Sequence, residues 1–130
     1  MKSVLVIMAF LAAGSVWADD CPVQFGPDSY LDDVTFTILA AKSCYEAATI
    51  AKDCALGASG DYQTTRAAQV KCEMDFARKL NKSEAGHYRR LNNKCTAKYK
   101  NMSGSMYTSF AAFCRLSVAE LYSELYTPAE

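Results

Sequence analysis

Six cysteines are the side chains of this 130-residue chain best suited to chemistry, because thiolates bind metals, attack substrates or pair as disulfides. Zinc sites usually draw cysteines in pairs that are two to four residues apart. The nearest two here, Cys44 and Cys54, have nine residues between them. An even number of cysteines in a short exported chain is instead typical of a disulfide framework. The sequence therefore predicts no metal site, no cofactor and three disulfides, formed by Cys21, Cys44, Cys54, Cys72, Cys95 and Cys114.

The single histidine does not complete a catalytic set with these cysteines. His87 precedes Cys95 by eight residues, and a thiol nucleophile needs a base beside it. Cys95 is expected to be oxidised, however, and no nucleophile motif surrounds it. The adjacent carboxylates Asp32 and Asp33 would point about 100° apart on a helix, which suits a helix N-terminus better than a catalytic pair. The sequence thus predicts a protein that is not an enzyme.

The start of the chain has the pattern of a secretory signal peptide. Lys2 supplies a positive charge, residues 4–13 are almost wholly apolar, and small residues occupy the cleavage positions. The apolar run is too short to span a bilayer. We therefore expect a signal peptide over residues 1–18 and one domain over residues 19–130. The product should be secreted, or periplasmic in a bacterium, and should not span a membrane.

The elements that must position these residues are helical. The three prolines, at positions 22, 27 and 128, lie outside the main body of the chain. Stretches that contain Gly and Ser, at 56–61, 80–86 and 102–105, interrupt the helical pattern. They leave four helical runs: 29–56, about 62–80, one that begins after Ser83, and about 106–126. The first run is long and could bend near residues 35–37. Asp61 is a candidate cap for the second run.

The positions of the cysteines relative to the expected loops rank the disulfide pairings. Short loops make neighbouring helices antiparallel. Cys44 and Cys72 lie about fifteen and thirteen residues from a loop near residue 59, so they should meet. Cys95 and Cys114 lie about nine and ten residues from a loop near residue 104, which leaves Cys21 for Cys54. A Cys72–Cys95 bond across the middle hairpin is the main alternative.

Charge is divided unevenly along the chain. Residues 19–61 carry eight acidic and two basic side chains, whereas residues 65–100 carry ten basic and three acidic ones. In the second segment Arg90, Lys94 and Lys98 form a row at i, i+4 and i+8, away from the apolar stripe that contains Cys95. This row could bind an anionic surface or an acidic protein, or it could balance the acidic first helix or simply be solvated. Nucleic acid is not an expected partner of a secreted chain with a net charge near zero.

Two further features concern the surface and the interior. The sequons at Asn81 and Asn101 fall at expected helix ends and are candidate glycosylation sites in a eukaryotic host. Eight tyrosines and six phenylalanines are many for this length. Such side chains usually pack together, but they could also enclose a ligand cavity. The expected lining of that cavity is Phe36, Tyr88, Phe110 and Phe113.

Together these patterns predict an all-α, up-down bundle of about four helices stapled by three disulfides. The expected function is that of a secreted, non-enzymatic binding protein of a signalling, inhibitor or effector type, which uses a helical surface. The alternative is a carrier of small hydrophobic ligands in a cavity of the bundle. Arg90, Lys94 and Lys98 are the candidate binding residues, toward an unknown protein or an anionic surface.

Overall fold

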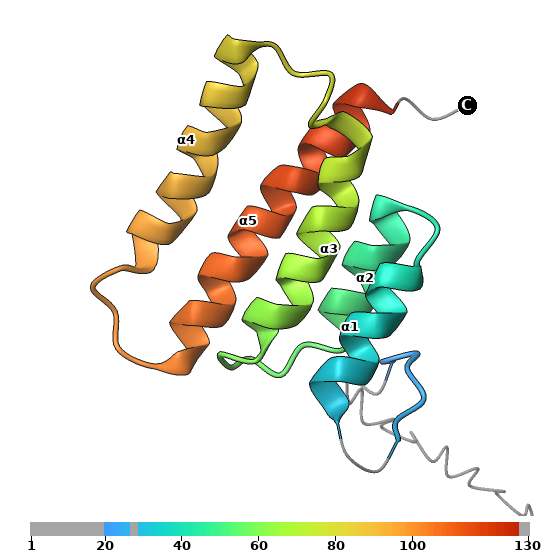
Figure 1. The fold of residues 1–130 in the computed structure, drawn as a ribbon. Helices are drawn as coiled ribbons and strands as arrows, with labels where there is room; N and C mark the ends of the chain where they lie inside the picture. The colour runs from blue at the N-terminus through green and yellow to red at the C-terminus, as the bar shows by residue number, and fades with distance from the viewer. Residues whose placement is uncertain (1–19, 27–28, 128–130) are drawn as a thin grey trace, which may run out of the picture.

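The computed structural model describes residues 20–26 and 29–127, so the predicted signal peptide lies outside the described residues. Five α-helices run alternately up and down (Figure 1): α1 (Tyr30–Ala40), α2 (Cys44–Asp53), α3 (Asp61–Phe76), α4 (Lys82–Tyr99) and α5 (Ser105–Tyr126). No strand occurs in the described part of the chain. The all-α, disulfide-stapled bundle is therefore confirmed. None of the described helices has the length and apolar character needed to cross a bilayer.

The predicted first run is two helices, not one. Ser43 caps α2, because its Oγ accepts a hydrogen bond from the backbone N–H of Glu46 (3.1 Å). The carboxylate of Glu46 reaches back and accepts from the backbone N–H of Lys42 (2.7 Å). This exchange resembles a capping box, and Ser-x-x-Glu at 43–46 is its sequence signal. The bend expected near residues 35–37 was wrong, since those residues lie inside α1.

The helices are arranged around α3 and α5. In Figure 1 these two run side by side in the same direction, α1 and α2 lie on one side of them, and α4 forms the opposite edge. α4 packs against α5 and makes no comparable packing with α1, α2 or α3. Of its residues only Cys95 is fully buried. One edge helix is therefore held mainly by a single neighbour.

Small side chains let the central helices approach closely. Buried alanines face one another from α2, α3 and α5, among them Ala47, Ala51, Ala68, Ala112 and Ala119. Larger apolar side chains, Val34, Ile38, Phe76 and Leu116, fill the remaining space. Helix axes can come closer where alanine replaces a longer side chain, so the core is thin but continuous.

The three disulfides are Cys21–Cys54, Cys44–Cys72 and Cys95–Cys114, the pairing that ranked first from the sequence. The Cys72–Cys95 alternative is not formed. One bond ties the N-terminal segment to the end of α2, the second joins α2 to α3, and the third joins α4 to α5. All six cysteines are used, so no free thiol remains.

Asp61 has a different role from the predicted one. It is the first residue of α3, only 1 % exposed, and its carboxylate does not cap that helix. Instead it accepts hydrogen bonds from the backbone N–H groups of Leu56 (2.7 Å), Gly57 (2.8 Å) and Ala58 (3.3 Å), and from Ser109 Oγ on α5 (2.6 Å). Gly57 has φ +68°, a conformation that glycine adopts without strain and that lets the loop curl around the carboxylate.

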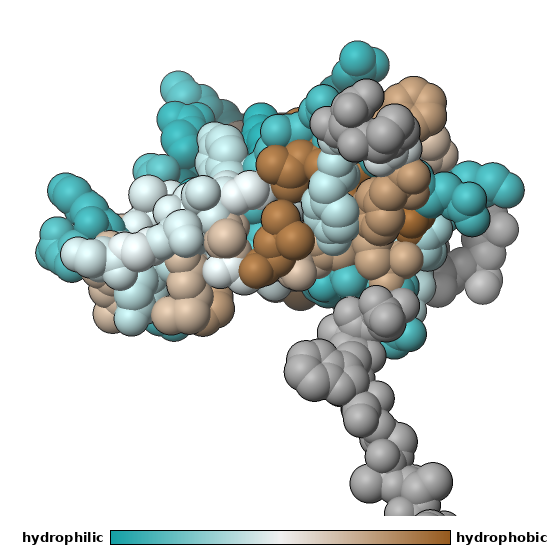
Figure 2. Space-filling view, turned by 90° about the horizontal axis from the view of Figure 1, so that it is seen from below, coloured by the Kyte–Doolittle hydropathy of each residue, from teal (hydrophilic) through white to brown (hydrophobic). Residues whose placement is uncertain are grey.

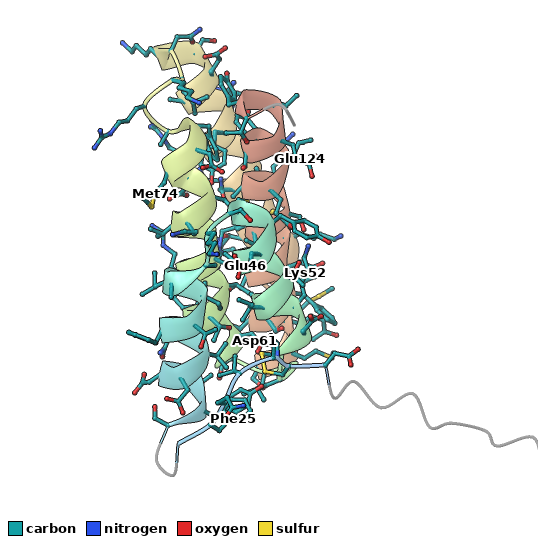
Figure 3. All side chains as sticks on the ribbon, turned by 90° about the vertical axis from the view of Figure 1, so that its right-hand side faces the viewer. Phe25, Glu46, Lys52, Asp61, Met74 and Glu124 are labelled. Atoms are coloured by element: carbon teal, nitrogen blue, oxygen red, sulfur yellow. A yellow bond between two sulfur atoms is a disulfide. The ribbon has the colours of Figure 1, made fainter. Side chains whose placement is uncertain are left out.

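Asp61 lies at the lower end of the bundle (Figure 3), and a second Asp–Ser pair lies near the C-terminal ends of α3 and α5. There Ser123 Oγ of α5 donates to Asp75 Oδ2 of α3 (2.5 Å). Each pair joins residues that are 48 apart in sequence. The two aspartates are therefore as far apart on α3 as the two serines are on α5, and this separation is fourteen residues. Fourteen residues make almost four full turns, which returns both pairs to the same helix face. The two pairs fix the register of α3 against α5.

The lower end of the molecule also gathers loops and apolar side chains. Tyr30 Oη donates to the backbone carbonyl of Cys54 (2.8 Å), and the ring of Tyr30 stacks on Phe25 (4.5 Å between centroids). Leu56 projects from the loop before α3 and stays 53 % exposed. Seen from below, apolar side chains form a group in the middle of this end, beside hydrophilic ones (Figure 2).

Replacement of Asp61 tests its role. We expect Asp61→Ala to lower the free energy of unfolding by about 3 kcal/mol or more, because three loop N–H groups and a serine lose a charged acceptor. Asp75→Ala, which removes one hydrogen bond, is the matched control and should cost about 1.5 kcal/mol. Urea unfolding with the disulfides intact measures both. Equal losses would contradict the assigned role of Asp61.

The attachment of α4 gives a second prediction. Cys95→Ala with Cys114→Ala should cost about 3 kcal/mol and should release α4 selectively, because that helix buries little else. Amide hydrogen exchange should show lost protection in α4 while α3 keeps most of its protection. The control pair, Cys44→Ala with Cys72→Ala, removes a bond between α2 and α3 and should reduce protection across the core. An unchanged exchange rate in α4 would contradict this account.

Candidate functional site

The three residues of the predicted basic row lie on the surface of α4. Arg90, Lys94 and Lys98 are all exposed on α4. The described residues contain two ion pairs, Lys52–Glu120 and Arg66–Glu73, and neither involves the row. α4 does not pack on α1, so the row does not balance the acidic first helix. The remaining interpretations are a solvated face and a docking surface.

An apolar groove runs beside this row, between α4 and α5. It has a volume of about 560 Å³, and we name it the α4–α5 groove; its lining is Lys98, Tyr99, Phe110, Phe113, Cys114, Ser117, Val118 and Leu121. Phe110 is 43 % exposed and Leu121 is 52 % exposed. The ring of Tyr99 lies 5.9 Å from that of Phe110, and Lys98 Nζ lies 5.3 Å from the centroid of Tyr99. Cationic and apolar side chains therefore share one edge of the molecule.

The residues expected to line an internal cavity do not meet. Phe110 and Phe113 line the α4–α5 groove. Tyr88 instead packs in an aromatic cluster with Phe76 (5.1 Å) and Tyr122 (4.9 Å). Phe36 lies on α1 and is 75 % exposed. The predicted lining was wrong, because the α1 face that carries Phe36 is turned away from the core.

A second groove, which the sequence did not predict, lies on the other flank of α4. Its walls come from α3 and α4, and Arg115 of α5 also lines it, so we name it the α3–α4 groove. Its volume is about 510 Å³. The other lining residues are Tyr62, Arg66, Gln69, Glu73, Ala85, Tyr88, Arg89 and Asn92. Three helices contribute to it, so a periodic pattern along any one helix gives no signal of it.

Comparison of the chain with protein-family models, with curated proteins and with solved structures gave no match. The surfaces themselves are therefore the basis for any functional argument.

Other residues singled out from the sequence have structural roles. The side chain of Asn81 caps α4 by accepting from the backbone N–H of Glu84 (2.9 Å) and forms a capping box with it. Asn101 is exposed just after α4, so both sequons stay candidate glycosylation sites. Asp33 accepts from the backbone N–H of Gly26 (2.9 Å) and does not form a pair with Asp32. His87 is exposed, and Cys95 is in a disulfide.

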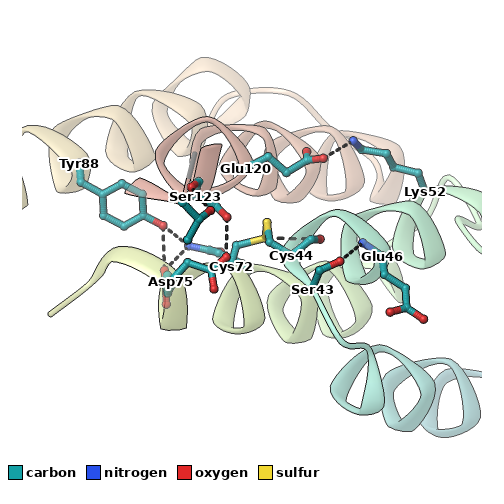
Figure 4. The surroundings of a disulfide bond; sticks show 12 residues. Ser43, Cys44, Glu46, Lys52, Cys72, Asp75, Tyr88, Glu120 and Ser123 are labelled. Carbon is teal, nitrogen blue, oxygen red and sulfur yellow. Dashed lines mark hydrogen bonds and ion pairs between the residues drawn. A yellow bond between two sulfur atoms is a disulfide. The ribbon is translucent and has the colours of Figure 1, made fainter. Parts of the chain in front are cut away.

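In the acidic pocket beside the Cys44–Cys72 bond, two of the three lining carboxylates, Asp75 and Glu120, already have partners (Figure 4). Lys52 Nζ lies 2.6 Å from a carboxylate oxygen of Glu120, and Ser123 donates to Asp75. Within the described ranges, no three His, Cys, Asp or Glu side chains gather closely enough to hold a metal ion. We assign no ligand to this pocket.

A hydrogen-bonded network organises one wall of the α3–α4 groove. Tyr88 Oη and Gln69 Nε2 both donate to Glu73 Oε1, each at 2.9 Å. The pKa of Tyr88 is raised to about 12, chiefly because burial disfavours the phenolate. The donor Gln69 lowers this pKa, whereas the hydrogen bond and the charge of Glu73 raise it. Tyr88 therefore stays protonated and anchors α4 to α3.

The raised pKa of Tyr88 predicts a pH-dependent stability. An unfolded tyrosine ionises near pH 10, whereas folded Tyr88 holds its proton until about pH 12, so its contribution is complete below pH 10 and is lost between pH 10 and 12. Tyr88→Phe should lower the free energy of unfolding at pH 7 by about 1.5 kcal/mol, through the lost bond to Glu73. The deficit of this variant should shrink above pH 10.

Urea unfolding at pH 8, 10 and 11 measures the deficit. Tyr45→Phe is the control, since Tyr45 is 79 % exposed and its removal should change little at any pH. A deficit of Tyr88→Phe that stays constant with pH would contradict the assignment.

Proposed function

We propose that this chain is a secreted, non-enzymatic binding protein that docks an acidic partner protein on the α4–α5 groove. The observation that carries the proposal is the exposed row Arg90, Lys94 and Lys98, free of ion pairs among the described residues, beside exposed apolar side chains. Three disulfides are compatible with an extracellular setting.

The apolar part of the groove favours a binding role over simple solvation. Phe110 and Leu121 of α5 line this groove and are 43 % and 52 % exposed, and the half-buried Phe113 and Val118 lie between them in sequence and line it too. Contiguous exposed apolar side chains of this size, bordered by charge, are typical of an interaction site. A partner that covers them removes apolar surface from water and gains about 25 cal/mol for each Å².

Charge and shape define the partner. The cationic row attracts acidic side chains and increases the rate of encounter with them. The shallow apolar space between the two helices gives an amphipathic helix a surface on which to lay its apolar face, with its acidic residues turned toward the row. We therefore favour an acidic, helical segment of a protein.

The carrier alternative has less support. Its four expected lining residues are distributed over two grooves and an exposed face, and only Phe110 and Phe113 line the same space. The largest buried side chains instead pack in the core around Phe76 and Leu116.

Charge reversal tests the docking surface. Arg90→Glu, Lys94→Glu and Lys98→Glu are combined in one bait, with Lys42→Glu, Arg78→Glu and Lys82→Glu as a control of equal charge change on other exposed positions. Both baits and the wild type, with disulfides intact, are used for quantitative affinity purification from the native fluid. An acidic protein should be retained by the wild type and the control but reduced at least tenfold on the reversed bait, a loss of about 1.4 kcal/mol.

Leu121→Asp should reduce the amount of the same partner protein that is retained, since it places a charge in the apolar part of the groove. The affinity between this protein and the purified partner should then fall as the salt concentration rises, because salt screens the attraction between their charges. Retention of the partner in equal amounts by all baits would reject the proposal. So would binding of the wild-type protein to phosphatidylserine vesicles when no protein is enriched on the baits.

A further inference from the structure

The α3–α4 groove holds an excess of positive charge. Arg66, Arg89 and Arg115 reach it from α3, α4 and α5, one from each helix. Glu73 is the only acidic residue in the lining. Arginine presents a planar fork of N–H donors that matches the oxygens of carboxylate, sulfate and phosphate groups, and it keeps its charge at any physiological pH.

Glu73 neutralises only one of these arginines. Its carboxylate accepts from Tyr88 (2.9 Å) and Gln69 (2.9 Å), and it forms an ion pair with Arg66 (3.4 Å). Arg89 is exposed and makes no hydrogen bond or ion pair with other described side chains. Two of the three guanidinium groups therefore lack an acidic partner within the described chain.

Arg115 is held in place without a carboxylate. One of its terminal nitrogens donates to Thr96 Oγ1 on α4 (2.8 Å), and its Cζ lies 5.5 Å from the centroid of the Tyr62 ring on α3. It thus spans the groove from wall to wall, and its remaining N–H donors are available. A positioned guanidinium binds an oxyanion with a smaller loss of conformational entropy than a freely moving one.

The groove continues toward the lower end of the bundle. An adjoining pocket of about 290 Å³ shares Tyr62 and Arg115 with it and adds Thr96, Tyr99, Lys100 and Tyr107 to the lining. The extended groove therefore combines four cations with four tyrosines, Tyr62, Tyr88, Tyr99 and Tyr107. Figure 1 shows α5 running between α3 and α4.

We propose that the extended α3–α4 groove binds an acidic oligosaccharide that carries sulfate or carboxylate groups. The ring of Tyr62 is 51 % exposed and offers a flat apolar face on which a sugar ring can stack. The hydroxyls of Tyr62, Tyr99 and Tyr107 line the extended groove and can bind sugar hydroxyls. The arginines and Lys100 supply the charge that selects an acidic chain over a neutral one. The elongated shape accommodates several linked rings better than a single small anion.

This site shares Tyr99 with the lining of the proposed protein-docking surface but none of its charged residues. Arg89 and Arg90 are neighbours in sequence, but about 100° separates them on a helix, and only Arg89 lines the α3–α4 groove. The two positions therefore provide a matched comparison within one helix. A failure of the oligosaccharide site leaves the α4–α5 groove untouched, and the reverse also holds.

The test uses the intact protein and three probes: a heparin-derived tetrasaccharide, chitotetraose in its fully N-acetylated and therefore neutral form, and inorganic sulfate. Calorimetry should show that the sulfated tetrasaccharide binds, that chitotetraose binds at least tenfold more weakly, and that sulfate alone does not reproduce the affinity. Chemical shift changes should concentrate on Arg66, Arg89, Arg115 and Tyr62. Arg66→Gln with Arg89→Gln should weaken tetrasaccharide binding at least tenfold.

The control pair, Arg90→Gln with Lys94→Gln, removes the same charge from the other flank and should change the affinity less than threefold. Circular dichroism verifies that both pairs are folded. Equal weakening by the two pairs would show general charge attraction and would overturn the proposal. So would absence of binding, equal binding of chitotetraose, or a sulfate affinity equal to that of the tetrasaccharide. Preferential binding of a phosphorylated peptide over the tetrasaccharide would likewise overturn it.

Discussion

Two aspartate–serine hydrogen bonds hold α3 and α5 in one register, and the rest of the molecule is built on that pair. Asp61 with Ser109 and Asp75 with Ser123 are separated by fourteen residues on both helices, about 21 Å of helix length. Between them lie small or fully buried side chains such as Ala68, Ala112 and Leu116. A carboxylate inside a protein is stable only when its oxygens are hydrogen-bonded, and Asp61 meets this condition with four donors. A slip of one turn would leave these donors and acceptors without partners.

The position of α4 follows from this central pair and explains where the candidate surfaces lie. α4 packs against α5 and is joined to it by Cys95–Cys114, so both of its flanks face solvent. One flank forms the apolar groove beside the basic row, and the other forms the arginine-lined groove with α3. A fully packed four-helix core would have closed the second space, because α4 would then bury a face against α3. The same incomplete burial makes the disulfide and Tyr88 important for holding α4 in place.

The features that depend on spacing along one helix could be predicted from the sequence, and those that need several helices could not. The distance of each cysteine from a loop ranked Cys44–Cys72 and Cys95–Cys114 first, because paired residues of antiparallel neighbours lie equally far from the loop that joins the helices. Cys21–Cys54 then followed by elimination. The break between α1 and α2 had a readable signal in Ser43 and Glu46, which the long apolar pattern obscured. The role of Asp61 had none, since its donors come from a loop and from α5. Arg89 and Arg90 look alike in sequence, and only the packing of α4 separates them.

The cap at the start of α4 has a consequence for covalent decoration of the surface. Asn81 Oδ1 accepts a hydrogen bond from the backbone N–H of Glu84, while the attachment point for a sugar in a sequon is the other polar atom of the amide, Nδ2. The two uses therefore do not compete, and a carbohydrate joined here would leave the first turn of the helix intact. It would also extend from the end of α4 where Ala85 and Arg89 begin the arginine-lined groove, so its bulk would restrict entry from that side.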